Sequence, residues 1–428
     1  MDGEVSALSL QPAGPDEAVV IVGAGAAGLA TAIFTRQLNP TRPVILLDGA
    51  ARPGAKILVS GGSRCNVTNS VVTDQDYWGG KRTIIRRVLR ALPVPATVAF
   101  FERIGVRLKE EGDGKLFPRS DRSREVLEAL LRAASDAGVT MSPGTRVNDV
   151  SAGRRFTVQT SRGPLRARAV VLATGGLSLP KTGSDGGGLI IAQSLGHTMV
   201  QTTPALAPLL VSDGFHAQVS GVAHEAELTV WIDGRASERL RGSMLWTHFG
   251  ISGPVALNAS RHILRGQLEG ARVDVSVSFA PSESFEAVDA RWTAQAAQRA
   301  KTSVRNALAE ELPASVADAV LESLALDGGT ALTDFSRVAR RHLAHALVAL
   351  PLSVPGSRGY NYAEATAGGI RLEEIDPSTM ESRKCRSLFL VGEMLDVDGR
   401  IGGFNFQWAW SSGRAAAEGI TRTLSVNP

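Results

Sequence analysis

The sequence has few of the residues that would build a disulfide-stabilised or membrane-spanning protein. Two cysteines in 428 residues, Cys65 and Cys385, cannot form a disulfide framework, which favours a reducing compartment. No apolar run reaches the roughly 18 residues of a membrane span. Residues 1–17 lack the basic and apolar regions of a signal peptide and are expected to be a loose leader. We therefore expect a cytoplasmic protein without a membrane partner.

The overall composition excludes further classes. Hydrophobic residues make up 43% and charged residues 21%, as in ordinary globular proteins, so the chain as a whole is not disordered. Its length predicts two or three domains. The seven histidines do not cluster at metal-ligand spacing, so no metal site is expected.

One stretch is strongly basic although the net charge is only +4. Lys81 to Arg132 contains thirteen Lys and Arg residues against seven Asp and Glu residues. We interpret it as a solvated helix surface, because few aromatic residues interleave with the arginines. Contact with the phosphates of an RNA is the alternative.

The most informative stretch is near the start of the chain. The apolar run from Ala18 to Val22 predicts a buried strand, and Gly23-x-Gly25-x-x-Gly28 follows where that strand would turn into a helix. A second apolar run ends at Asp48, twenty positions after Gly28. This order of strand, glycines, helix and acid indicates a dinucleotide pocket, and the acid favours the unphosphorylated ribose of FAD or NAD over NADP.

The rest of the chain predicts strands and helices in an order that returns to this domain at the end. Apolar patterns predict helices over 83–104, 121–137 and 189–195, a helical segment over 285–349, and strands over 145–150, 155–160, 165–168, 169–173, 205–211, 226–232, 273–279 and 387–391. Asp233-Gly234 is a predicted turn. A further helix begins after Gly402-Gly403, so the dinucleotide domain is expected to be split in sequence.

Five motifs in order carry a family resemblance. They are Gly23 to Gly28, Ser60-Gly-Gly-Ser-Arg-Cys-Asn-Val-Thr-Asn69, Ala173-Thr-Gly-Gly-Leu-Ser-Leu-Pro-Lys-Thr-Gly183, Thr247-His-Phe-Gly-Ile-Ser-Gly-Pro254 and Gly392-Glu-Met-Leu-Asp-Val-Asp-Gly-Arg-Ile-Gly-Gly-Phe-Asn405. Together they resemble the three-domain bacterial FAD flavoproteins, NAD(P)/FAD-dependent oxidoreductases that include aminoacetone oxidase, a bile-acid dehydro-steroid reductase and a ribosomal RNA dihydrouridine synthase. The resemblance spans about residues 18–422 and does not specify the substrate.

The resemblance and the strand order together predict an α/β fold. A Rossmann-like FAD-binding domain, split in sequence over 18–195 and 355–428, would carry an inserted β-rich substrate domain over 196–284 and 345–354. A small helical subdomain would occupy 285–344.

The resemblance also implies the FAD-binding residues. The first glycines and Asp48 would hold the ADP half, the loop around Lys56 would follow the pyrophosphate and flavin, and the last motif would contact the ribityl chain and isoalloxazine. The implied set is Gly23, Ala24, Gly25, Ala26, Ala27, Gly28, Asp48, Lys56, Gly61, Gly62, Arg64, Asn66, Val147, Ala173, Thr174, Gly175, Gly392, Glu393, Gly403, Asn405 and Phe406. Glu393 stands where related flavoproteins often carry Asp.

No catalytic residue is identified, because flavin carries the hydride chemistry itself. Arg64 is a candidate for binding an anionic group. His248 is a weak candidate proton donor, with a hydrogen-bonded structural histidine the favoured interpretation. Cys65 has no partner cysteine nearby in sequence and is expected to be a small buried contact.

Aromatic pairs near the end of the chain have two interpretations. Tyr360 and Tyr362 are candidates to line a pocket beside flavin, whereas the helical setting of Trp408 and Trp410 favours core packing.

We expect an FAD-dependent oxidoreductase that transfers hydride to or from a small organic substrate, held between the inserted domain and the flavin. Oxygen or NAD(P)H is the expected redox partner, and no second strand–glycine–helix motif provides a nicotinamide domain. Two alternatives remain: reduction of a uridine in ribosomal RNA to dihydrouridine, and a flavin-binding sensor or interaction protein without turnover.

Overall fold

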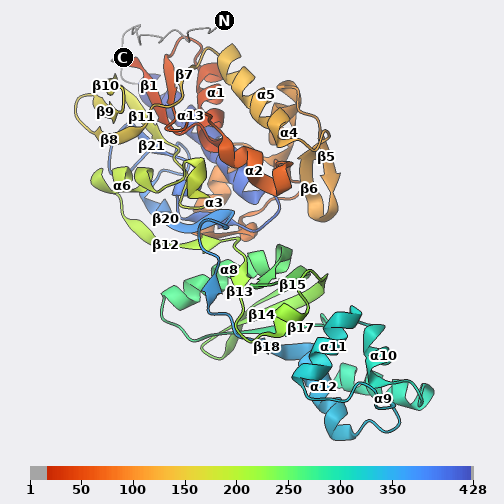
Figure 1. Ribbon diagram of the computed structural model, residues 1–428. Coiled ribbons are helices and arrows are strands. Elements are labelled where there is room, and N and C mark those ends of the chain that lie inside the picture. The colour runs from red at the N-terminus through yellow and green to blue at the C-terminus, as the bar shows by residue number, and fades with distance from the viewer. Residues whose placement is uncertain (1–16, 426–428) are drawn as a thin grey trace, which may run out of the picture. The chain divides into compact units, whose positions relative to one another are not determined.

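The computed structural model describes residues 17–425, and residues 1–16 of the predicted leader lie outside this range. The chain forms two compact units (Figure 1). The first comprises the residues up to Gln201 and from Gly368 onward, and the second runs from Thr202 to Ala367. The chain passes from one unit to the other in β12 (Met199–Ala205) and returns in β20 (Ala365–Ile370), which form a two-stranded sheet.

A five-stranded parallel sheet forms the centre of the first unit. Its order is β21 (Leu388–Leu390), β11 (Ala169–Leu172), β1 (Val19–Val22), β2 (Val44–Leu47) and β7 (Thr140–Ser142). All four residues of β1 are buried, as expected for a strand covered on both faces. β21 completes the sheet from the C-terminal part of the chain, so this domain is split in sequence.

Helices and small sheets complete the first unit. α1 (Ala26–Leu38) packs against α13 (Phe404–Ser425) and α5 (Ser123–Asp136), and α5 also contacts α2 (Ala55–Ser63). The remaining elements are α3 (Arg82–Leu89), α4 (Val94–Arg103), α6 (Gly187–Ser194), β3 (Thr68–Asn69), β4 (Tyr77–Gly79), β5 (Leu108–Glu111), β6 (Lys115–Pro118), β8 (Val147–Ser151), β9 (Phe156–Thr160), β10 (Gly163–Ala167) and β22 (Val397–Gly399). The helical pattern over 83–104 is two helices, because Pro93 precedes the first turn of α4 and Pro95 lies within that turn.

The second unit is built on a mixed-length antiparallel sheet of seven strands. Its order is β18 (Leu350–Leu352), β17 (Val273–Ser278), β14 (Ala223–Ile232), β15 (Arg235–Thr247), β16 (Gly250–Ser252), β13 (Leu209–Leu210) and β19 (Gly356–Ser357). Asp233 and Gly234, both with positive φ, connect β14 to β15, which confirms the predicted turn.

The helices of this unit are α7 (Phe215–Gln218), α8 (Gly253–Leu268), α9 (Phe285–Gln298), α10 (Val304–Ala309), α11 (Ala314–Ser323) and α12 (Arg337–Ala349). Several elements of this unit were not predicted, and β15 and α8 are the longest of them. β15 was missed because charged residues such as Arg239 and Arg241 interrupt its apolar pattern. α8 begins at Gly253 and Pro254, the last two residues of the fourth motif, and continues beyond that motif.

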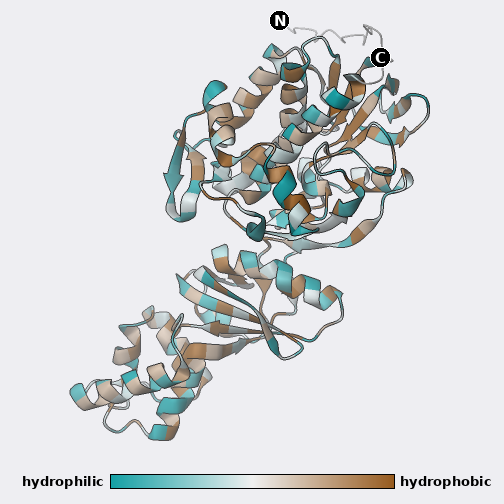
Figure 2. Cartoon of the chain, turned by 180° about the vertical axis from the view of Figure 1, so that it is seen from behind, coloured by the Kyte–Doolittle hydropathy of each residue, from teal (hydrophilic) through white to brown (hydrophobic). Residues whose placement is uncertain are grey.

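The helices carry hydrophilic and hydrophobic residues side by side (Figure 2). None of the helices in residues 17–425 is long and apolar enough to cross a membrane.

The packing of Trp246 in the core of the second unit predicts how much this side chain contributes to the free energy of unfolding. Trp246 is fully buried against Phe215, and its Nε1 donates to His224 Nε2 over 2.9 Å. Trp246→Ala leaves a cavity and an unpaired imidazole nitrogen, so we expect the free energy of unfolding to fall by about 3–5 kcal/mol. Urea denaturation measures this. Val338→Ala, at a side chain that is 80% exposed, is the control and should change it by less than about 0.5 kcal/mol. Similar losses in the two variants would contradict the assignment of this core.

Candidate functional site

The predicted site residues converge on one edge of the parallel sheet. Because the strands run in the same direction, their carboxyl ends share that edge. β1 is followed there by Gly23, β2 by Asp48, β11 by Ala173 and β21 by Val391 and Gly392. The structure therefore brings together four segments that are up to 369 positions apart, from Gly23 to Gly392.

The turn from β1 into α1 assigns different roles to its glycines. A Cβ on Gly28 would lie 1.8 Å from the carbonyl oxygen of Gly23, so this position allows helix and strand to pack closely. A Cβ on Gly25 would meet nothing within 4 Å. Gly25 also begins α1 without a side-chain cap, which leaves the first amides of the helix available. Open space before an uncapped helix start fits a pyrophosphate group.

Asp48 holds this turn in place. Its Oδ2 accepts a hydrogen bond of 2.7 Å from Ala24 N, and its Oδ1 accepts one of 2.7 Å from Ala50 N. A carboxylate has about four acceptor sites, so two remain for the hydroxyls of a ribose. Val147, which begins β8 and is 9% exposed, lies two residues after Thr145, whose amide donates to the Asp48 carbonyl.

A partly buried polar cluster joins three more segments of the edge. Lys56 forms an ion pair with Glu393 and contacts Ser178 Oγ, which in turn donates to Glu393 Oε1 over 2.6 Å. The side chains of Lys56 and Glu393 are 25% and 18% exposed. Ser178 was not among the predicted residues. Its presence within the motif after β11 was the only signal for it, because its partners are 122 and 215 positions away.

The segment after Lys56 is partly helical rather than a continuous loop. α2 becomes non-helical at Ser60, and Gly61 and Gly62 take positive φ. Asn66 is 8% exposed and its Oδ1 is buried without a hydrogen-bond partner. An unpaired buried acceptor is costly, so this atom fits a donor from a bound ligand such as a flavin N–H.

Arg64 and His248, the two catalytic candidates, lie in different units of the chain. Arg64 Nη1 pairs with Glu111 at 2.9 Å and Asp121 at 3.5 Å, and its guanidinium lies 4.0 Å from the centre of the Phe117 ring. His248 belongs to the second unit, where it is exposed and meets Phe249 edge-on.

The entry into α13 closes the site from the C-terminal motif. A Cβ on Gly403 would lie 2.5 Å from the backbone of Thr68, so glycine permits this close approach. The side-chain amide of Asn405 forms two hydrogen bonds with Gly399. Its Oδ1 accepts from Gly399 N over 2.8 Å, and its Nδ2 donates to Gly399 O over 2.9 Å. Phe406 stacks on Trp410. The side chain of Asn405 therefore shapes the loop before α13.

The two aromatic pairs lie in different units and differ in their surroundings. Trp408 and Trp410 are 1% and 0% exposed, which confirms the predicted core packing, and their Nε1 atoms donate to Gly392 O and Val67 O. Tyr360 Oη bonds Thr202 Oγ1 in the second unit, and Tyr362 is half exposed over Arg358.

A family model described as the HI0933-like protein Rossmann domain matches residues 17–419. The chain belongs to this family. A 3-dehydro-bile acid delta(4,6)-reductase of Clostridium scindens is 32% identical over 93% of this chain and 98% of its own length. A ribosomal RNA dihydrouridine synthase of Escherichia coli is 30% identical over 95% of this chain and 98% of its own length.

A solved structure shares the fold. A quinol fumarate reductase chain of E. coli matches with a TM-score of 0.51 and 16% identity, over 96% of this chain and 71% of that chain. Family membership confirms the predicted Rossmann-like α/β fold, the FAD cofactor and the oxidoreductase class of this HI0933-like protein.

The open space at Gly25 predicts how FAD can be removed without unfolding the protein. Gly25→Val places a side chain where we expect the pyrophosphate, and its Cβ meets no protein atom within 4 Å, so the variant should fold and lose FAD. Flavin absorbance per chain and circular dichroism measure the two properties. Gly28→Ala is the contrasting variant, because its Cβ meets the Gly23 carbonyl and should destabilise the fold itself. Stoichiometric FAD in the Gly25 variant would contradict this placement.

Cys65 predicts a chemically silent thiol. It is fully buried, and burial raises the pKa of the Cys65 thiol to about 12. Because the thiolate is the reactive form, iodoacetamide at neutral pH should leave Cys65 unmodified in the native protein and label the less buried Cys385 first. Mass spectrometry reads the labelled peptides, and both should react in denaturant. Equal native rates would show that Cys65 is accessible.

Proposed function

We propose that this flavoenzyme reduces a carbon–carbon double bond conjugated to a carbonyl group in a small organic substrate. Two relatives share that chemistry, since a bile-acid delta(4,6)-reductase and a dihydrouridine synthase, by their names, both saturate such a bond. The observation that supports flavin binding in this proposal is the convergence of the glycine turn, Asp48 and the Lys56–Glu393 pair on one edge of the sheet.

The chain's own residues would bind and orient the cofactor. Gly25 would leave room for the pyrophosphate at the start of α1, and the free acceptor sites of Asp48 would receive the ribose hydroxyls. Asn66 Oδ1 would accept from the flavin edge. FAD, when bound, supplies the hydride.

The Lys56–Ser178–Glu393 cluster would fix the electrostatics of the site. The ammonium and the carboxylate neutralise one another, and the serine hydroxyl links them, so the cluster holds α2, the loop after β11 and the end of β21 together. Lys56→Met would leave the Glu393 carboxylate without its cation in a mostly buried place. Because an uncompensated charge there is costly, such a variant should bind FAD less tightly than the wild type.

Reduction of a ribosomal uridine is the second candidate, favoured by one observation. Helix α3 exposes Arg82 and Arg87, and the exposed Arg90 follows directly at its C-terminal cap. Other cations of that stretch are neutralised, as in the pairs Arg86–Asp74 and Lys109–Asp121. The positive charge that an RNA could use therefore extends from α3 to other exposed arginines of the stretch, such as Arg103 and Arg132.

Stopped-flow reoxidation tests the proposed reaction. The FAD-loaded protein is reduced under nitrogen and mixed with a 3-keto steroid that has a conjugated double bond. Recovery of the oxidised flavin spectrum, together with a product heavier by two hydrogens, is the expected result. The saturated steroid is the matched control. Reoxidation by neither compound and rapid reoxidation by oxygen would instead indicate an oxidase, and a chain that takes up no FAD would rule out both.

Nucleoside analysis of ribosomal RNA separates the second candidate. A strain lacking this protein should keep all its dihydrouridine if the substrate is a small molecule. Loss of one dihydrouridine, restored by the wild-type gene and not by the Gly25→Val variant, would establish the RNA reaction instead.

A further inference from the structure

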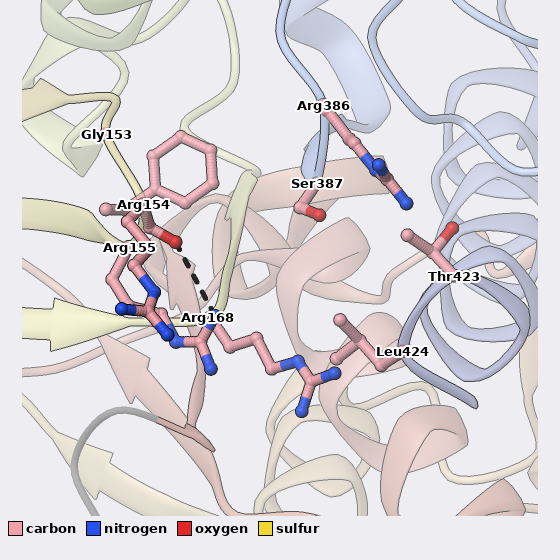
Figure 3. Close-up of a pocket in the computed structure, with 9 residues that line it drawn as sticks. Gly153, Arg154, Arg155, Arg168, Arg386, Ser387, Thr423 and Leu424 are labelled. Atoms are coloured by element: carbon pink, nitrogen blue, oxygen red, sulfur yellow. Dashed lines mark hydrogen bonds between the residues drawn. The ribbon is translucent and has the colours of Figure 1, made fainter. Parts of the chain in front are cut away.

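The amino edge of the parallel sheet, opposite the edge described above, holds a pocket of about 270 Å³ (Figure 3). Arg168 directly precedes β11, and Arg386 and Ser387 directly precede β21, which places the pocket where these strands begin. The turn between β8 and β9 and the last turn of α13 complete it. We call it the arginine pocket, and its lining residues are Gly153, Arg154, Arg155, Phe156, Arg168, Arg386, Ser387, Thr423 and Leu424.

Four of these nine residues are arginines. In Figure 3, Arg154, Arg155 and Arg168 lie on one side and Arg386 on the other, next to Thr423. Like charges repel, and a guanidinium offers five N–H donors and no acceptor. Anions that neutralise the arginines would therefore stabilise this arrangement.

The protein supplies part of that neutralisation. Glu17 pairs with Arg155 at 2.8 Å and with Arg168, and the hydrogen bond from Arg168, followed by the contact with Arg155, lowers the pKa of Glu17. Arg168 is only 8% exposed, so this pair anchors the floor of the pocket.

Two arginines are left over. Arg154 and Arg386 are exposed, and neither forms an ion pair with any residue of the described range 17–425. Arg154 contributes its carbonyl oxygen to Arg155 Nη1 at 3.5 Å, which leaves its own guanidinium uncommitted. A second acid nearby, Glu381, accepts hydrogen bonds from Ser387 N and Thr423 Oγ1. These two donors are neutral groups and not arginines.

The other walls suit a small ligand with one charged end. Phe156 and Leu424 are both 5% exposed and give the pocket an apolar side, and Ser387 and Thr423 add hydroxyl groups. Arginine pairs with phosphate through parallel hydrogen bonds, and two guanidinium groups from opposite walls can hold the same group.

We propose that the arginine pocket binds a phosphate or pyrophosphate group, at a site separate from the FAD site. Arg154 and Arg386 supply the binding charge, and the Glu17–Arg155–Arg168 cluster positions the wall around it. The group comes either from free pyrophosphate or from the phosphate end of a nucleotide whose base lies against Phe156.

Titration calorimetry of the FAD-loaded protein tests this at constant ionic strength. Pyrophosphate, ADP and adenosine are the three probes, and bound FAD keeps ADP out of the dinucleotide site. Saturable binding of pyrophosphate and ADP, with none of adenosine, is expected. ADP binding more tightly than pyrophosphate would identify a nucleotide as the source, and equal affinities would identify the phosphate group alone.

Variants of the two uncommitted arginines make the test specific. Arg154→Ala with Arg386→Ala should weaken pyrophosphate binding at least about tenfold, since each removes charged hydrogen bonds. Arg103→Ala with Arg132→Ala removes two exposed arginines from α4 and α5 and is the charge-matched control, which should bind as the wild type does. Flavin absorbance should stay unchanged in both variants. An absence of saturable binding in the wild type, or an equal loss in the two double variants, would overturn the proposal.

Discussion

The parallel direction of the five central strands is the constraint on which the rest of the structure depends. It places all the carboxyl ends on one edge and all the amino ends on the other, whatever the distance along the chain. The complete burial of β1 keeps that order fixed, because a shifted strand would expose apolar residues. The carboxyl edge of the sheet therefore arises from strand direction, and the side chains there only refine it.

The sequence predicted the parts of this arrangement that depend on local pattern. Strands β1, β2, β11 and β21 are short apolar runs, and Gly23, Gly25 and Asp48 follow them at spacings set by backbone geometry. Long-range partners were not predictable. Nothing local indicates that Arg64 pairs with Glu111, 47 positions away, or that Lys56 pairs with Glu393, 337 positions away. The charged strand β15 was missed for a related reason. Pairing with its neighbouring strands in the sheet makes it a strand, although its charged residues do not give an apolar strand pattern in the sequence.

The two edges of the sheet differ in the groups that they offer to an anion. At the carboxyl edge, glycines leave space in front of the free backbone amides at the start of α1, which has no side-chain cap. The nearby cation Lys56 is neutralised there by Glu393. At the amino edge, side chains provide the charge and a single carboxylate, Glu17, balances part of it. Backbone amides select for shape and close approach, whereas guanidinium groups tolerate ligands of several shapes. The first edge thus suits one cofactor and the second an exchangeable ion.

The late position of β21 has a consequence for protein synthesis. Gly392 follows Gly175 by 217 residues, so a ribosome needs roughly 10–40 s to make the chain between them. During that time β11, whose four residues are all buried in the finished sheet, has no neighbour on its β21 side. The nascent chain must keep this apolar edge from pairing with other chains while the second unit folds. Because Gly392 is made after Ala367, the carboxyl edge of the sheet is complete only once the second unit has been translated.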